Sequence, residues 1–372
     1  MRTSWRIGSI YGIEIYIDSS WLIIFALITW SLSSFYFPHY YPGWLIRMYW
    51  LIGVTTSILF FISVLIHELA HSLVAKKQGE EVRNITLFIF GGAAQIAEEP
   101  DRPSKEFRMA IIGPLTSIAL AIVFGLIWWI VRAVNQPVAA LTRYLAFINV
   151  ILALFNLLPG FPLDGGRVLR SIVWGVTGNF KRATRIATWA GEVLAFILIV
   201  WGIVQVFSGS FIGGLWIAFI GWFLHSAASR SYHQVFLREM LRGVRARDLM
   251  TKDFTTVTGT ISVQQLIDEY VLRHKDHAFL VSENGQLQGI VCLEDVKAVP
   301  PEKRGTTMVK DVMTPKEKLE TADPEDDGNA VLRQLAAKDV RQLPVMERGN
   351  VIGILCRSDI IQNLQLRTEL GV

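Results

Sequence analysis

The sequence is poor in charge and poor in cysteine for its length. Only 18% of its 372 residues are charged and 52% are hydrophobic, with a mean hydropathy of +0.38. This composition excludes an ordinary soluble protein, but it leaves room for a membrane domain together with a soluble one. Cys292 and Cys356 are the two cysteines. No disulfide framework is therefore expected, in agreement with a reducing cytoplasm.

A basic face with interleaved aromatic residues is also missing, so nucleic acid is not expected as a partner. The charge is uneven: residues 1–243 carry 19 Lys and Arg against 12 Asp and Glu, and residues 244–372 carry 17 against 20. A basic first part is expected from the cytoplasmic loops of a membrane protein. No short apolar core with a cleavage site follows the basic N-terminal residues, so we expect an uncleaved protein.

Apolar segments long enough to cross a membrane dominate the first part of the chain. Each is close to the ~20 residues that a spanning helix needs. We predict six spans, at residues 14–36, 47–75, 107–132, 141–158, 185–207 and 211–226. Basic residues gather in one set of loops, within residues 2–6, 76–108 and 167–185. Because cytoplasmic loops carry an excess of Lys and Arg, both chain termini are predicted to lie in the cytoplasm.

The second span contains the sequence HELAH at residues 67–71. On a helix His67 and His71 project from one face, so two ring nitrogens can bind one zinc ion. Glu68 lies about 100° round the helix, where it can take a proton from the attacking water. An ionisable side chain at the bilayer centre costs about 2.5–3.5 kcal/mol, so three of them together indicate a compensating role such as a metal site. The alternative is a chance occurrence of the pattern.

A catalytic zinc site needs a third protein ligand and an open fourth position. Asp164 is the candidate, within the sequence NLLPGFPLDGG at residues 156–166 that ends the fourth span. The prolines and glycines break the helix, so Asp164 is expected on irregular backbone. Such backbone is tolerated at membrane depth only inside protein or beside a wet cavity. The alternative is that Pro-Gly and Asp-Gly-Gly simply end a helix.

Residues 84–96, NITLFIFGGAAQI, are too few to span a membrane as a helix. Their β-branched and aromatic residues around a Gly-Gly pair predict a β-hairpin. We assign Gly91, Gly92 and Gln95 to substrate binding, because an edge strand can pair with an extended peptide through backbone hydrogen bonds. The alternative is a loop that only plugs the site.

Two further features of the membrane part are ambiguous. Gly113 and Pro114 open the third span, and we interpret them as a helix-packing feature. Glu192 lies inside the fifth span, where an acidic residue is a functional candidate by default. It also lies close to the basic edge of that span, where pairing with Arg185 is the alternative.

The last third of the chain contains an internal repeat. DLMT at residues 248–251 recurs as DVMT at 311–314, and GIVC with Asp295 recurs as GILC with Asp359. Each unit is expected to contain a helix, two strands joined by a turn and a short final helix. One unit is too small to bury its apolar face well, so the two should pack as a pseudo-symmetric pair.

Together, the HELAH and N-x-x-P-x-x-P-L-D-G-G motifs resemble the site-2 protease family of intramembrane zinc metalloproteases. The resemblance implies one Zn²⁺ per chain, with His67, His71 and Asp164 as ligands and Glu68 as the catalytic base. It also implies that Asn156 helps to hold the substrate or the oxyanion. A membrane-associated strand segment between the second and third spans agrees with the family, and single-span membrane proteins are the implied substrates.

The repeated unit resembles a tandem pair of CBS (cystathionine-β-synthase) domains. This implies that an adenine nucleotide binds between the repeats, with Asp295 and Asp359 on the ribose. Cys292 and Cys356 stand where a Ser or Thr is common, and a thiol is a weak donor. A purely structural module, or one that forms a homodimer, is the alternative. The predicted domains are a protease domain at 1–228, a connector at 229–243 and CBS domains at 244–305 and 306–372. The connector is expected to be an amphipathic helix on the inner lipid surface, and an ordinary linker helix is the alternative.

The predicted fold is an α-helical multi-pass membrane domain of about six transmembrane helices, followed by a small α/β tandem CBS pair. We predict a cell-membrane endopeptidase that cleaves transmembrane segments of its substrates, with cytoplasmic CBS domains that modulate its activity or access. The main alternative is a CBS-regulated ion transporter or channel. A compact metal cage argues against it, because permeation needs weak, serial sites. The intact Glu68 argues against a catalytically inactive adaptor.

Overall fold

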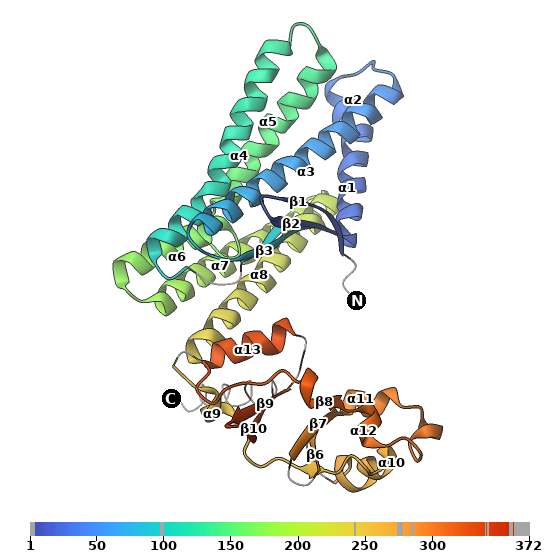
Figure 1. Cartoon of the computed structure of the whole chain (residues 1–372). Helices are drawn as coiled ribbons and strands as arrows, with labels where there is room; N and C mark the ends of the chain where they lie inside the picture. Colours follow the sequence, from blue (N-terminus) through green and yellow to red (C-terminus); the bar gives the residue numbers. More distant parts are fainter. Residues whose placement is uncertain are drawn as a thin grey trace. The chain divides into compact units, whose positions relative to one another are not determined.

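The computed structural model describes the chain apart from its two ends and a few short internal segments (Figure 1). The described residues are 4–96, 100–241, 243–273, 278–283, 286–338, 340, 342–356 and 360. The chain divides into two compact units, Met1–His233 and Gln234–Val372.

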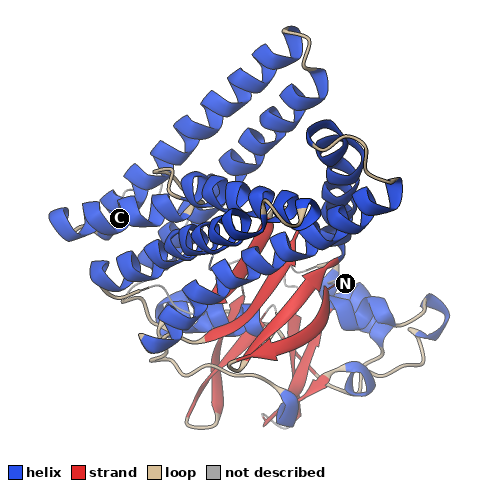
Figure 2. Cartoon of the chain, turned by 90° about the horizontal axis from the view of Figure 1, so that it is seen from above, coloured by secondary structure: helices blue, strands red, loops and turns tan. Residues whose placement is uncertain are grey.

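Helices make up most of the first unit, and within the described residues a four-stranded sheet accompanies them. Figure 2 shows the helices and strands of the whole chain in separate colours. The helices are α1 (Ser19–Ser31), a π-helical turn (Leu32–Tyr36), α2 (Phe37–Tyr40), α3 (Ile46–Lys77), α4 (Pro103–Val131), α5 (Gln136–Asn156), α6 (Asp164–Thr177), α7 (Phe180–Phe207) and α8 (Phe211–Met240). Within the described residues, six helical segments are long and apolar enough to cross a membrane: α1 with α2, then α3, α4, α5, α7 and the first part of α8. The predicted number of six spans is therefore confirmed.

The spanning helices expose apolar side chains outward and pack through small residues. Trp129 and Phe207, for example, are 62% and 86% exposed, which suits lipid rather than water. Gly202 of α7 lies directly against Ala218 and Gly214 of α8, where no larger residue would fit. The predicted connector is not a separate element over its first part, because α8 continues from the sixth span to Met240.

The first span begins later than predicted, because strands precede it. Residues 13–18, IEIYID, alternate apolar and polar side chains with the period of a strand, and they form β2 (Ile13–Asp18). Asp18 then caps α1, since its side chain accepts a hydrogen bond from the backbone N–H of Ser20 at 2.9 Å.

The sheet of the first unit joins two hairpins that are far apart in the sequence. Its order is β1 (Ser4–Ile10), β2, β3 (Val82–Phe88) and β4 (Gly91–Ile96), which leaves β4 at an edge. The predicted hairpin at residues 84–96 is confirmed by the antiparallel pairing of β3 with β4. The parallel pairing of β2 with β3 was not predicted, because it joins residues that lie 70 apart, such as Glu14 and Asn84.

Asp164 lies on a helix, and the expectation of irregular backbone was wrong for this residue. The irregular segment ends at Leu163, whose backbone is extended, and Asp164 is the first residue of α6. An acidic side chain suits the positive end of a helix. Gly165 and Gly166 let this end approach the preceding loop, since a Cβ atom on Gly165 would lie 2.3 Å from the carbonyl oxygen of Leu157. Asp-Gly-Gly therefore begins a helix here rather than ending one.

The second unit shows the predicted repeat. Its main pairs are two antiparallel hairpins, β6 (Ala278–Glu283) with β7 (Gln286–Cys292), and β9 (Gln342–Glu347) with β10 (Asn350–Cys356). The other described elements are α9 (Ala246–Leu249), β5 (Thr256–Val257), α10 (Val263–Leu266), a π-helical turn (Ile267–Val271), α11 (Leu293–Ala298), a 3-10 turn (Pro301–Lys303), α12 (Val309–Val312), β8 (Thr314–Pro315), a 3-10 turn (Lys316–Lys318) and α13 (Gly328–Ala337).

The two repeats pack against each other through a shared apolar cluster. Leu280 and Ile290 of the first repeat lie in this cluster with Ile354 of the second. The backbone of Thr251, at the entry of the first repeat, also exchanges two hydrogen bonds with Ile354, at 2.9 and 3.0 Å. The repeats therefore form one pair, as predicted from their size.

Candidate metal centre and catalytic site

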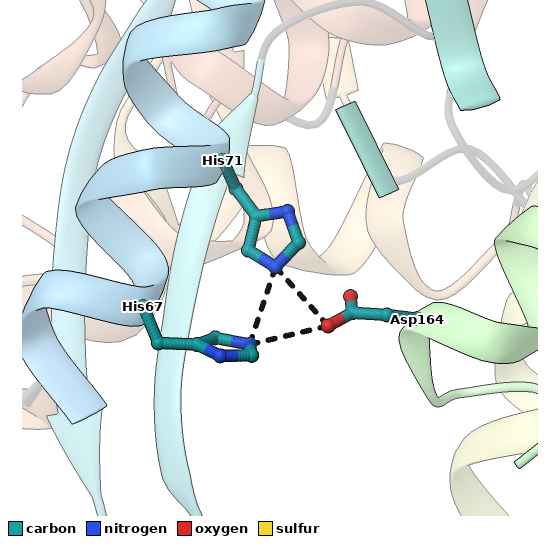
Figure 3. Close-up of side chains that lie close together, drawn as sticks. All are labelled: His67, His71 and Asp164. Carbon is teal, nitrogen blue, oxygen red and sulfur yellow. Dashed lines mark hydrogen bonds and ion pairs between the residues drawn. The ribbon is translucent and has the colours of Figure 1, made fainter. Parts of the chain in front are cut away.

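Helix α3 brings the two histidines of the HELAH sequence to one buried face. His67 and His71 are 3% and 5% exposed, and their rings lie 4.9 Å apart between centroids. The helix forms here because the flanking residues are apolar and lack helix breakers. The two Nε2 atoms point toward one place and lie 3.2 Å apart (Figure 3).

Asp164 completes the group from the opposite side. Its Oδ2 atom lies 3.1 Å from Nε2 of His67 and 3.1 Å from Nε2 of His71 (Figure 3). Its side chain is only 15% exposed. Asp164 is the first residue of α6, so its carboxylate reaches the histidines from the start of a helix. This helix lies far along the chain, since Asp164 follows His71 by 93 residues.

The second nitrogen of each imidazole is held by α4. Nδ1 of His71 lies 2.6 Å from the carbonyl oxygen of Met109, and Nδ1 of His67 lies 2.9 Å from Oγ of Ser117. A carbonyl oxygen can only accept, so the proton of neutral His71 lies on Nδ1 and leaves a lone pair on Nε2. This is the tautomer that metal binding through Nε2 requires.

The three converging atoms fit a zinc ion. Zinc bonds of about 2.0–2.2 Å in tetrahedral geometry place neighbouring donors about 3.3–3.6 Å apart, a few tenths of an ångström more than a site without the ion needs. The observed separations are 3.1, 3.1 and 3.2 Å. A proton on one imidazole could bridge only one of these three close pairs, whereas a cation would hold all three atoms. The described part of the chain offers one such group of His, Cys, Asp and Glu side chains.

Glu68 lies beneath the edge strand of the sheet. A Cβ atom on Gly92 of β4 would lie 2.4 Å from Cγ of Glu68, so the backbone of β4 passes directly over this side chain. Along the strand, Gly92 shares a face with Ala94, whereas Gly91 and Gln95 share the opposite face. The Gln95 side chain is exposed and accepts a hydrogen bond from Asn84 at 3.3 Å. Of the three residues assigned to substrate, Gly92 therefore contacts the catalytic helix.

Asn156 is the last residue of α5 and directly precedes the loop that leads to Asp164. Its side chain is half-buried. None of the described contacts joins its amide to the histidines or to Asp164. Glu192, the ambiguous acid of the fifth span, accepts a hydrogen bond from Ser229 of α8 at 3.4 Å.

Gly113 has a closer connection to the site than the helix-packing interpretation predicted. A Cβ atom there would lie 2.1 Å from Nε2 of His71 and 2.7 Å from Nε2 of His67. Met109, Gly113 and Ser117 are four residues apart and line one side of α4. In the sequence, the small residues Gly113 and Ser117, spaced four apart, indicate that another segment packs closely against this side of α4. They do not indicate that the segment carries the histidines.

In the second unit, Asp295 caps the start of α11. Its carboxylate accepts the backbone N–H of Cys292 at 2.8 Å, and the Cys292 thiol lies 3.9 Å from the Gln342 side chain of the other repeat. This thiol is therefore engaged between the repeats. Asp359 lies outside the described residues.

Comparisons with known proteins match both units. The model of peptidase family M50 matches residues 55–133 and 127–200, and the CBS domain model matches residues 246–302 and 309–366. Rip3 of Mycobacterium tuberculosis is 37% identical over 364 residues, 97% of this chain and 92% of that protein. The zinc metalloprotease MJ0392 of Methanocaldococcus jannaschii is 32% identical over 318 residues, 84% of this chain and 86% of that protein.

Among solved structures, a site-2 protease from Methanocaldococcus jannaschii aligns with 62% of this chain and 95% of its own chain, at 27% identity and a TM-score of 0.43. The regions that match the first family model contain both histidines, Glu68 and Asp164.

Proposed function

This chain belongs to peptidase family M50 and is a zinc metalloprotease with two CBS domains, and we propose that it cleaves peptide bonds within the membrane segments of other proteins. One observation carries the proposal. The Nε2 atoms of His67 and His71 and the Oδ2 atom of Asp164 converge in a buried site. Glu68 follows His67 on the same helix, and edge strand β4 passes directly over its side chain.

His67, His71 and Asp164 would hold the zinc ion. Three protein ligands are the number that a catalytic zinc site uses, and they would leave a place on the ion for substrate or water. When bound there, zinc would polarise the scissile carbonyl group and make a water molecule more acidic. Met109 and Ser117 hold the imidazoles in their orientation through the Nδ1 atoms.

Glu68 is the proposed general base. It follows His67 in the sequence and therefore lies beside the ligands on the same helix. In this position its carboxylate can take the proton from the attacking water and pass it to the leaving amine. Asn156 is proposed to hold the substrate or the oxyanion, an assignment that rests on the motif it begins.

Strand β4 is the proposed docking site for the substrate backbone. It lies at the edge of its sheet, so its outer N–H and C=O groups are available for pairing in the described structure. A peptide that pairs there is extended, which exposes its carbonyl groups beside Glu68. Gly91, Gly92 and Gln95 would contribute backbone groups, and single-span membrane proteins are the proposed substrates.

The protein is a multi-pass membrane protein, and we propose that both termini and the CBS domains lie in the cytoplasm. The support is the distribution of Lys and Arg among the loops. Helix α3 ends at Lys76 and Lys77, six residues beyond His71. In this orientation water reaches the site from the cytoplasm without crossing the bilayer.

The CBS pair is proposed to modulate activity by binding an adenine nucleotide. Asp295 lies in the first turn of α11, where its carboxylate accepts the backbone N–H of Cys292 at the end of β7, and it is a proposed ribose ligand together with Asp359. A nucleotide can change the rate only if it binds the active and inactive arrangements with different affinities. A purely structural role, or homodimer formation through the CBS pair, is the alternative.

The test uses the full chain in proteoliposomes with a single-span substrate. We expect about one zinc per wild-type chain, less zinc in Asp164→Asn, and normal zinc but no cleavage in Glu68→Gln, because Gln cannot accept the proton. Cleavage by Glu68→Gln at a near-normal rate would reject the general base. Ion flux without peptide cleavage by the wild-type protein would support a CBS-regulated transporter instead.

A further inference from the structure

A buried ion pair joins two of the helices that build the site. The side chains of Glu106 in α4 and Arg170 in α6 are 0% and 3% exposed. Nε of Arg170 donates to Oε1 of Glu106 at 2.7 Å, and its Nη2 atom contacts the same oxygen. Arg167, one turn earlier on α6, lies 3.9 Å from that oxygen but remains partly exposed. Neither Glu106 nor Arg170 has a role in the reaction proposed above.

The guanidinium group of Arg170 also lies against two aromatic rings. It is 5.0 Å from the ring centroid of Phe161 and 4.7 Å from that of Phe180. Phe161 belongs to the loop that leads to Asp164, and Phe180 begins α7. Arg170 therefore connects α4, this loop and α7 through one side chain. A planar guanidinium with several N–H groups can make all of these contacts at once, whereas an ammonium cannot.

Glu106, Phe161 and Arg170 lie three to six residues in the sequence from a proposed zinc ligand or from a group that holds one. Glu106 is three residues before Met109, whose carbonyl oxygen holds His71. Phe161 is three residues before Asp164, and Arg170 is six residues after it. The ion pair thus ties the helix that backs the histidines to the helix that carries the carboxylate ligand.

Net stability is a weak explanation for such a pair. Removing two charges from water costs about as much as their attraction returns, and apolar residues of similar size often serve stability equally well. A buried pair of this kind can instead fix the position of one helix relative to another. Such fixing matters here, because Asp164 on α6 must approach the Nε2 atoms of two histidines on α3.

We propose that the Arg170–Glu106 pair is a positioning device that sets Asp164 at bonding distance from zinc held by His67 and His71. This inference rests on the ligand set proposed above. Metal-bound carboxylates and imidazoles depend on the groups that orient them, and loss of such groups typically weakens metal binding 10–100-fold.

The experiment measures zinc release from the purified full-length protein to a chelator. The double variant Glu106→Gln with Arg170→Met removes both charges and keeps similar volumes, so no unpaired charge stays buried. We expect it to melt close to the wild-type temperature but to release zinc at least about 10-fold faster. Arg170→Lys keeps the charge but loses the fork and the ring contacts, and it should also release zinc faster.

The control is Asp101→Asn. Asp101 precedes the start of α4 and forms a solvent-accessible ion pair at 2.8 Å with Lys105, the residue before Glu106 on that helix. Its loss should leave zinc release unchanged. The visible spectrum of the Co²⁺-substituted protein gives a second readout, because it reports the geometry of the donors. We expect the spectrum to change in Arg170→Lys and to stay unchanged in Asp101→Asn.

Wild-type zinc release and a wild-type Co²⁺ spectrum in Arg170→Lys and in the double variant would overturn the proposal. If the double variant does not fold, Arg170→Lys decides by itself. The variant His67→Ala shows whether such a result means that the positioning role is wrong or that the proposed zinc ligands are wrong. If that variant also keeps its zinc, the ligands are wrong; if it loses zinc while the Arg170 variants keep it, only the positioning role is wrong.

Discussion

Replacement of Gly113 by Ala is the sharpest test of how α4 supports the metal site. The new methyl carbon would lie 2.1 Å from Nε2 of His71 and 2.6 Å from its Cε1 atom. It would also lie 2.7 Å from Nε2 of His67. Non-bonded carbon and nitrogen atoms need more than 3 Å, so the rings must move by roughly 1 Å or more. Ring nitrogens that move this far cannot keep their zinc bonds, since metal–ligand distances hold to within about 0.2 Å.

The expected result is a loss of zinc rather than a loss of the fold. Two of the three proposed ligands are displaced together, so we expect affinity for zinc to fall at least about 100-fold, or about 2.7 kcal/mol. Ala is a better helix former than Gly by about 0.5–1 kcal/mol, so α4 itself should not be weakened. Cleavage should be lost together with the metal.

Gly125 provides a matched control on the same helix. A Cβ atom at Gly125 meets nothing within 4 Å, so Gly125→Ala makes the same chemical change without the clash. Both variants would be purified and dialysed against buffered zinc, and their bound metal would be measured by atomic emission. Their thermal unfolding would be followed by circular dichroism. If Gly113→Ala retained one zinc per chain with wild-type affinity, the described approach of α4 to the histidines would be incorrect.

Three further outcomes are expected. Gly92→Ala should keep zinc but slow cleavage at least about 10-fold, because the new methyl group would displace Glu68. Gln95→Ala, on the other face of β4, should cleave normally, and equal rates of the two variants in a peptide-release assay would contradict the placement of Gly92 over Glu68. Ser117→Ala should weaken zinc binding about 10-fold by freeing Nδ1 of His67, and unchanged affinity in a chelator competition would assign Ser117 to packing alone. AMP or ATP should bind the full chain in calorimetry and bind more weakly to Asp295→Ala; absence of heat with both nucleotides would reject the proposed nucleotide site.

The parts of the site that sequence reasoning predicted are those that depend on local geometry or on apolar length. His67 and His71 are four residues apart, and any helix brings such a pair to one face. The six spans follow from runs of apolar residues, because a helix is the solution that satisfies its own backbone in lipid. Asp164 could be chosen because its motif resembles a known family. Its exact backbone could not, because Asp-Gly-Gly can begin a helix as well as end one.

The parts that sequence reasoning missed depend on which faces meet. Helix α4 carries apolar residues all round, so its sequence does not show that Met109, Gly113 and Ser117 face the histidines. The pairing of β2 with β3 is also non-local, and it sets where β4 lies relative to Glu68. Both features arise only when segments far apart in the sequence have packed.

Arg170 shows why charge counting alone assigns some residues to the wrong environment. The distribution of basic residues placed it in a cytoplasmic loop, together with solvated neighbours. In the structure it is 3% exposed, and its carboxylate partner comes from a different helix. A Lys or Arg near the end of a span therefore has two explanations, a solvated loop position or one end of a buried pair. An acidic residue that is buried on another helix near a span boundary, as Glu106 is, distinguishes the second from the first. In this chain the buried Glu106 links Arg170 to the helix that backs the histidines, and so to the position of Asp164. A count of charged residues in the loops could not indicate that link.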